Sequence, residues 1–219
     1  MNAPLSLEAI FRLLFERFGP LHWWPAETPF EVCVGAILTQ NTAWSNVEKA
    51  ISALKQAGIL TPEALQESDT ELLARLIRPA GYFNVKSRRL KNFTAWLFLH
   101  HQGSLERMFA SHWQELRAEL LRVRGIGPET ADSILLYAGD KPTFVVDAYT
   151  RRLFQRLVLL PEAAGYEETR ALFMNHLPED VALFNEYHAQ IVQQCKSFCR
   201  SKPLCSDCPL RNSCPSRLA

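Results

Sequence analysis

Five of the six cysteines lie in the last 25 residues, in a pattern that suits metal ligation. Four of them follow the spacing C-x5-C-x2-C-x5-C: Cys199, Cys205, Cys208 and Cys214. Because the opening residues lack the uncharged core of a secretory signal, we expect these thiols to bind a metal or an iron-sulfur cluster rather than to form disulfides. The closely spaced pair Cys205 and Cys208 is separated from the outer cysteines by five residues on each side. This spacing favours a [4Fe-4S] cluster, with zinc as the less favoured alternative.

The sequence RGIGPETAD, from Arg124 to Asp132, interrupts a helical pattern with two glycines and a proline. Gly125 and Gly127 permit backbone angles that other residues avoid, and Pro128 can begin a helix because the first helical N–H needs no partner. The pattern predicts two short helices joined by a tight turn. Backbone amides at such a turn form an anion site that suits a phosphate.

The elements that position these motifs are expected to be helical, since no segment alternates with the period of a strand and no repeat of fixed length recurs. The first predicted helix carries charges inside its apolar pattern, unlike a membrane span, so we expect no membrane contact. The predicted helices, which end at Pro, Gly, Asn or Ser signals, span residues 5–18, 29–40, 44–57, 62–67, 69–77, 84–100, 113–123, 128–138, 148–158, 166–176 and 180–195.

The chain has 219 residues, 47% of them hydrophobic, which suffices for one large or two small domains with a buried core. Its formal net charge of +1 means that nucleic-acid binding would depend on local basic patches and backbone amides. Lys86, Arg88 and Arg89 form one such cluster, for which a solvated helix face is an equally weighted alternative. Cys33 and Cys195 lie in apolar patterns and are expected in the core.

Four segments and the cysteine tail together resemble the endonuclease III family of helix-hairpin-helix DNA glycosylases. The segments are AILTQNT at 36–42, GYFNVKSRRL at 81–90, GIGPETAD at 125–132 and VVDAYTRRL at 145–153. They match over nearly the whole chain, although the family usually has six residues between the first two cysteines and this chain has five. The resemblance implies an all-α, bilobed fold with a six-helix barrel lobe at 29–138. A discontinuous second lobe would combine 1–28 with 139–219 and carry the cluster loop at about 196–219.

The resemblance also implies base excision repair on double-stranded DNA, in which the damaged nucleotide is extruded into a pocket. Gln40 would fill the vacated space and Tyr82 would wedge the opposite strand. A monovalent cation is a further candidate ligand of the hairpin. We expect a monomer in the cytoplasm, associated with the nucleoid. The expected DNA-binding residues are Gln40, Tyr82, Arg124, Gly125, Ile126, Gly127, Thr130 and Arg151, with Arg152 beside the last.

Glu129 stands where family members that also cut the strand have a nucleophilic lysine. A carboxylate cannot form the Schiff base, so we expect a monofunctional glycosylase that uses water. Asp147 is the expected catalytic residue, because a carboxylate can stabilise the positive charge that develops on the sugar and can orient the water. Taken alone, Asp147 also suits a helix N-cap and Glu129 an ordinary first-turn acid.

Trp23, Trp24 and Trp44 are expected to line the base pocket. Indole faces attract flat cationic groups, and alkylated purines such as 3-methyladenine are cationic as nucleosides. The tryptophan pair and the LTQNT segment resemble the 3-methyladenine glycosylase branch of the family. The alternatives are a core role for Trp23 and Trp24, a bifunctional glycosylase and lyase for oxidised pyrimidines, a uracil or mismatch glycosylase, a non-catalytic DNA-binding module and an electron carrier.

Overall fold

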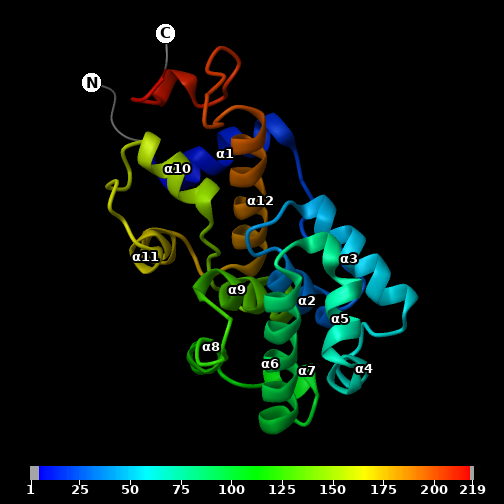
Figure 1. Cartoon of the computed structure of the whole chain (residues 1–219). Helices are drawn as coiled ribbons and strands as arrows, with labels where there is room; N and C mark the ends of the chain where they lie inside the picture. Colours follow the sequence, from blue (N-terminus) through cyan, green and yellow to red (C-terminus); the bar gives the residue numbers. More distant parts are fainter. Residues whose placement is uncertain (1–4, 218–219) are drawn as a thin grey trace. The chain divides into compact units, whose positions relative to one another are not determined.

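The structure is a computed structural model that describes residues 5–217, and in that range it contains helices, turns and loops but no β-strand (Figure 1). The predicted all-α class is confirmed. The chain divides into two compact units, Trp24–Lys141 and the pair of segments Met1–Trp23 and Pro142–Ala219. The sequence placed the corresponding boundaries at 29 and 138. No helix within 5–217 is both long and apolar enough to span a membrane.

The unit 24–141, all of which is described, is built around α2 (Pro29–Leu38), in which nine of ten residues are buried. A helix with no polar face must be covered on all sides. The helices that pack against it are α3 (Trp44–Gln56), α6 (Phe83–His101), α9 (Pro128–Ser133) and the π-helical turn η2 (Ile134–Ala138). The unit also contains α4 (Pro62–Glu67), α5 (Thr70–Leu76), the short 3-10 helix η1 (Arg78–Ala80), α7 (Leu105–Phe109) and α8 (Trp113–Leu120).

Eight α-helices in residues 24–141 exceed the six that the resemblance implied. The helix α7 was not predicted, because its five residues are too few to show a helical period. Side-chain caps explain several helix starts. The N–H of Glu31 donates to Thr28 Oγ1 at 3.1 Å, and the N–H of Ala64 donates to Thr61 Oγ1 at 3.2 Å, each with a proline at the first helical position.

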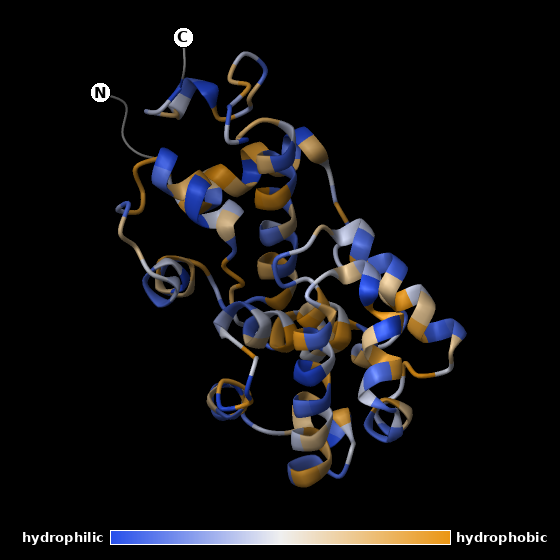
Figure 2. Cartoon of the chain, viewed as in Figure 1, coloured by the Kyte–Doolittle hydropathy of each residue, from blue (hydrophilic) through white to orange (hydrophobic). Residues whose placement is uncertain are grey.

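The other unit contains α1 (Leu7–Phe18), α10 (Ala148–Arg156), α11 (Tyr166–His176), α12 (Val181–Ser197) and the 3-10 turn η3 (Arg211–Ser213). Both α1 and α10 pack against α12, and their apolar faces form the core (Figure 2). The rings of Phe144 and Phe173 stack at 3.8 Å, and the Tyr187 hydroxyl donates to the Leu7 carbonyl at 2.8 Å. The first helix begins at Leu7 rather than residue 5, since Ser6 caps it.

Two of the predictions about single residues have clear outcomes. Cys33 and Cys195 are buried in the core, as predicted. The prediction of a basic cluster is wrong for Lys86, whose side chain is 1% exposed. Its position on α6 faces the interior because Ser87, Leu90 and the ring of Phe93 continue the same buried stripe.

Candidate active site and nucleic-acid interface

The hairpin predicted at 124–132 joins α8 to α9, and a buried ion pair links the two helices. Arg117 donates from Nε and Nη2 to the two carboxylate oxygens of Asp132 at 2.8 and 2.9 Å. Gly125 has φ +102, and a Cβ atom there would lie 2.3 Å from Cγ of Arg89, so this position requires glycine. Gly127 has extended backbone, φ −96 and ψ 177, so its predicted need for unusual angles is wrong.

The Gln40 side chain is bound to the hairpin. Its Nε2 donates to the Gly125 carbonyl at 3.1 Å and to Thr130 Oγ1 at 2.8 Å, and its Oε1 accepts a hydrogen bond from Arg89. Because Ile126 and Thr130 are each 5% exposed, they could meet DNA only through their backbone atoms. This agrees with the predicted anion site, which consists of backbone amides at the turn.

Tyr82, the aromatic residue expected to contact DNA, has an accessible side chain. It is 70% exposed and has left-handed backbone, with φ 45 and ψ 31, directly before α6. Behind it, the Nζ atom of Lys86 donates to the carbonyls of Leu38 and Ala80, both at 2.8 Å. Burial, and to a smaller extent the charge of Arg89, lowers the pKa of Lys86 to about 8.

Trp24 and Trp44 lie together with a third aromatic residue, Tyr137. The ring of Trp24 is edge-on to Trp44 at 5.0 Å and tilted against Tyr137 at 5.1 Å. A Cβ atom on Gly35 would lie 3.2 Å from Trp24 Cζ2, so the glycine allows this close packing. A pocket of about 280 Å³ opens beside the two indoles, between α2 and α3. Its lining also includes Pro25, Glu31, Glu48 and Lys55.

Trp23 belongs to the other unit and makes its contacts there. Its ring is edge-on to the imidazole of His188 at 6.4 Å, and the ammonium group of Lys196 lies 5.6 Å from its centre. Its indole N–H is buried with no hydrogen-bond acceptor among the described residues. These contacts fit the alternative reading of Trp23 as a core residue, so only Trp24 and Trp44 are placed against the same pocket.

Asp147 is both the N-cap of α10 and the partner of a buried histidine. Its Oδ1 accepts hydrogen bonds from the Thr150 N–H at 2.7 Å and the Thr150 hydroxyl at 3.0 Å. The Asp147 N–H donates in return to Thr150 Oγ1 at 3.5 Å, which completes a capping box. Its Oδ2 lies 3.6 Å from Nε2 of His188, on α12. The Asp147 side chain keeps 15% of its surface exposed.

The environment favours the charged form of Asp147. Burial raises the pKa of the carboxyl group, but the hydrogen bond and charge of His188, together with the two Thr150 donors, outweigh burial and leave the pKa below its ordinary value of 3.8. The carboxylate is therefore ionised at neutral pH. An ionised carboxylate can stabilise a developing cation or hold a water molecule.

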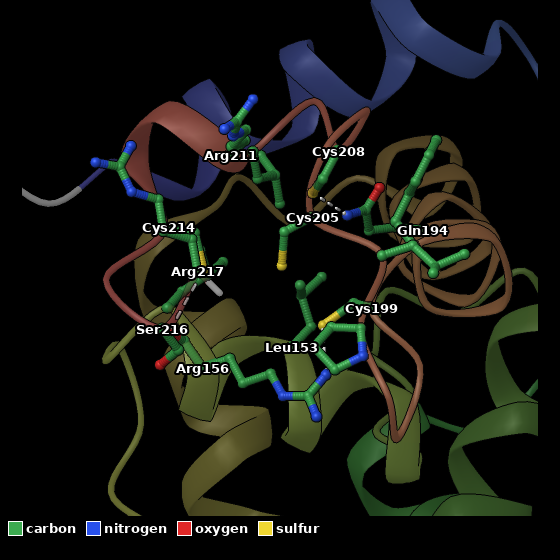
Figure 3. A pocket seen from close by; sticks show the side chains of 15 residues that line it. Leu153, Arg156, Gln194, Cys199, Cys205, Cys208, Arg211, Cys214, Ser216 and Arg217 are labelled. Atoms are coloured by element: carbon green, nitrogen blue, oxygen red, sulfur yellow. Dashed lines mark hydrogen bonds between the residues drawn. The ribbon is translucent and has the colours of Figure 1, made fainter. Parts of the chain in front are cut away.

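The four tail cysteines of the predicted ligand set line one cavity in the unit that contains α10 and α12. Figure 3 shows their sulfur atoms around this cavity. Its apolar wall includes Leu153, Leu157 and Leu210. Within 5–217, no three His, Cys, Asp or Glu side chains lie close enough to share one metal ion. A cubane does not require that closeness, because each thiolate binds a different iron atom. The cysteines are Cys199, Cys205, Cys208 and Cys214.

Two polar side chains donate to cysteine sulfur atoms at this cavity. Arg156 Nη1 lies 3.3 Å from Cys199 Sγ, and Gln194 Nε2 lies 3.1 Å from Cys208 Sγ (Figure 3). A hydrogen bond from Cys195 and the charge of Arg156 lower the pKa of Cys199, against the effect of burial. Arg152 donates from Nε to the Cys199 carbonyl at 2.8 Å, which ties α10 to the cysteine tail.

The sequence profile of the HhH-GPD superfamily, described as base excision DNA repair proteins, matches residues 34–179, which include the hairpin, Gln40, Tyr82 and Asp147. The chain belongs to this superfamily. The description of the superfamily and the names of similar proteins identify the chain as a DNA glycosylase of base excision repair. The matched range begins inside α2 and ends between α11 and α12. The predicted helix-hairpin-helix fold is confirmed.

Three proteins illustrate the range of similar HhH-GPD members. A protein of Methanocaldococcus jannaschii with the provisional name DNA repair glycosylase MJ1434 is 50% identical over 197 residues, which cover 89% of each chain. Endonuclease III of Thermotoga maritima is 30% identical over 195 residues, or 89% of this chain and 84% of that protein. The structure of H. pylori 3-methyladenine DNA glycosylase with 1,N6-ethenoadenine is 29% identical with a TM-score of 0.74. The superposition covers 86% of this chain and 96% of the H. pylori chain.

Several residues of this HhH-GPD site were not found from the sequence. His188 lies on the buried face of α12 with Phe184 and Ile191, where a lone polar ring among apolar neighbours was the available signal. Tyr137 belongs to a π-helical turn, which no local pattern distinguishes from an α-helix.

The two arginines that were expected to bind DNA, Arg124 and Arg151, have exposed side chains, as DNA contact would require.

Proposed function

We propose that the protein is a monofunctional DNA glycosylase that extrudes and excises an alkylated purine, with 3-methyladenine as the type substrate. The observation that carries the proposal is the pocket bounded by Trp24 and Trp44. Its volume of about 280 Å³ is near the lower end of small-molecule sites, roughly 300 Å³. The named substrate of the H. pylori relative supports the same class.

The charges around the pocket favour a cationic base. Glu31 is paired with Lys55 at 2.9 Å, and Glu48 supplies a second carboxylate to the lining. A cationic purine would therefore meet indole faces and a carboxylate together. Neutral oxidised pyrimidines would gain less from this arrangement. Since a cationic base leaves the sugar readily, the pocket needs to supply little acid catalysis.

Asp147 would then act on the sugar. Cleavage of the N-glycosidic bond puts positive charge on the sugar ring, and an ionised carboxylate stabilises that charge. With Oδ1 engaged by Thr150, the Oδ2 atom would face the sugar or orient the attacking water. Glu129, which is exposed at the start of α9, cannot supply the amine that a lyase reaction requires. The product would be an intact abasic strand.

DNA contacts would come from Gln40, Tyr82, Arg124, Arg151 and the hairpin backbone. In this structure the Gln40 amide is bound to Gly125, Thr130 and Arg89, so its insertion into DNA would exchange these hydrogen bonds for contacts with an orphaned base. A cluster bound by Cys199, Cys205, Cys208 and Cys214 would order the tail as a [4Fe-4S] centre. The N–H donors of Arg156 and Gln194 and the apolar wall fit such a group.

The test is a panel of duplexes that each carry one damaged base, with the released base identified by chromatography. The panel would hold 3-methyladenine, 7-methylguanine, 1,N6-ethenoadenine, uracil, thymine glycol and a thymine-guanine mismatch. We expect release of the alkylated purines and no strand cleavage before alkali. Release of thymine glycol with direct strand cleavage would instead support an activity like that of endonuclease III, the name that the T. maritima relative carries.

A further inference from the structure

A buried lysine connects the two segments that are proposed to probe DNA. Lys86 is 1% exposed, and its Nζ donates to the carbonyls of Leu38 and Ala80, both at 2.8 Å. A buried ammonium group destabilises a fold unless its donors are bonded. These two carbonyls therefore explain a lysine at a site where an apolar side chain would otherwise pack.

The two carbonyls that Lys86 binds occupy equivalent positions, each at the end of a helix and two residues before a residue that is proposed to probe DNA. Leu38 is the last residue of α2, and Ala80 is the last residue of η1, so each carbonyl lies at a helix end that lacks an intrahelical donor. Gln40 follows two positions after Leu38, and Tyr82 follows two positions after Ala80. A single ammonium group thus fixes the backbone immediately before both residues.

Both segments also hold strained backbone. Asn41 has φ 54 and Tyr82 has φ 45, in the left-handed region that non-glycine residues rarely occupy. Such conformations persist only when the surrounding structure imposes them. The hydrogen bonds from Lys86 supply one such constraint on each segment. The hydrogen bonds of the Gln40 side chain to Gly125 and Thr130 supply another on the first.

We infer that Lys86 is a positioning residue for base extrusion: it holds the segments of Gln40 and Tyr82 in register so that both side chains enter the duplex together. The inference rests on the proposed DNA-probing roles of these two residues. Lys86 itself would not touch DNA, because its side chain is buried. An uncharged side chain of similar length would fill the space but would leave two carbonyls without donors.

Lys91 provides a matched control on the same helix. Its Nζ donates to the carbonyls of Leu65 and Gln66, at 3.0 and 2.7 Å, near the end of α4. Lys91 therefore makes the same kind of contact with a segment that carries neither Gln40 nor Tyr82. Any general effect of removing a lysine that binds two carbonyls should appear in both K86M and K91M.

The experiment uses a duplex with a tetrahydrofuran abasic analogue and a neighbouring 2-aminopurine, whose fluorescence rises when insertion unstacks it. At saturating protein, checked by anisotropy, we expect K86M to give less than half of the wild-type rise and K91M to give the full rise. A wild-type rise in K86M, an equal loss in K91M or no rise with the wild-type protein would overturn the inference.

Two further arms keep the test decisive. If K86M does not fold, K86Q carries the same expectation, because its amide nitrogen is uncharged and one bond nearer the backbone than Nζ, so it cannot take the place of the ammonium group between the two carbonyls. A wild-type rise in K86Q would overturn the inference. The readout needs no excision, so it is independent of which base the enzyme removes. If no alkylated purine is released from the lesion panel but K86M still gives a smaller fluorescence rise than K91M, the proposed substrate is refuted. The positioning role of Lys86 is then still supported.

Discussion

The Oδ2 atom of Asp147 lies 3.6 Å from the Nε2 atom of the buried His188 ring, while Oδ1 of the same carboxylate caps α10. The two oxygens of one side chain thus have separate partners. This division allows a helix cap to serve as a catalytic group, because capping occupies only one of the two oxygens. It also makes the two roles separable by mutation.

Asp147→Asn should abolish most excision without unfolding the protein. Asparagine retains an oxygen for capping, so the melting temperature should stay near that of the wild type. Loss of the negative charge should slow single-turnover excision by roughly 100-fold or more, about 3 kcal/mol in the barrier. Binding to an abasic duplex, measured by anisotropy, should be retained. Near wild-type excision by the folded variant would show that Asp147 is only a cap.

His188→Phe should move the acid limb of the excision profile to higher pH. In the wild type, His188 opposes the effect of burial and keeps the pKa of Asp147 below 3.8, so the carboxylate stays charged as the pH falls to that value. Without His188, burial should raise the pKa and protonate Asp147 at higher pH. The measurement is kcat/KM against pH, corrected for uncatalysed base loss. An unchanged acid limb would contradict a role for His188.

The wild-type protein should leave abasic strands that nick only after alkali or heat. Borohydride reduction traps the Schiff base of a lyase, so no covalent adduct between protein and DNA is expected with Glu129 at the start of α9. Glu129→Lys tests whether the position can acquire weak trapping, although an amine without supporting residues often fails. An adduct with the wild-type protein would reveal a nucleophilic lysine elsewhere.

Trp24→Ala should weaken recognition of the base more than binding to DNA. Loss of a stacking face costs roughly 1 to 3 kcal/mol per base. An abasic duplex has no base to stack and should bind nearly as well as before. Trp96→Ala is the matched control, because Trp96 packs on Phe93 and His101 of α6 in the same unit, away from the pocket lining. Full activity of Trp24→Ala on alkylated DNA would reject the pocket assignment.

Protein purified without oxygen should be yellow-brown and contain about four irons per chain. Cys208→Ser should lower the iron content and the visible absorbance, since this sulfur lines the cavity and accepts from Gln194. Cys33→Ala removes a cysteine that is buried in the other unit and should leave the iron content unchanged. Stoichiometric zinc without iron would establish the alternative ligand.

Local features were readable from the sequence because they depend on neighbours in the chain. Helix spans follow from apolar periodicity and from breaks at Pro, Gly, Asn or Ser. The caps that the structure shows at Thr28 and Thr61 also act within four residues. The hairpin was predictable because Gly125 permits the left-handed backbone of the turn and Pro128 can begin the second helix. The identity of Asp147 as a cap followed from its place before AYTRRL, and the cysteine spacing followed from direct counting.

Side-chain direction and burial were decided only by tertiary packing. The sequence placed Lys86 with Arg88 and Arg89 in a basic cluster, but packing of α6 against α2 and η1 turned it inward onto two carbonyls. His188 meets Asp147 only because α12 packs against α10. These pairings join residues that are remote in the chain, and no local periodicity encodes which face of one helix meets another. The free energy of burying apolar faces selects that arrangement, and the polar contacts of the site follow from it.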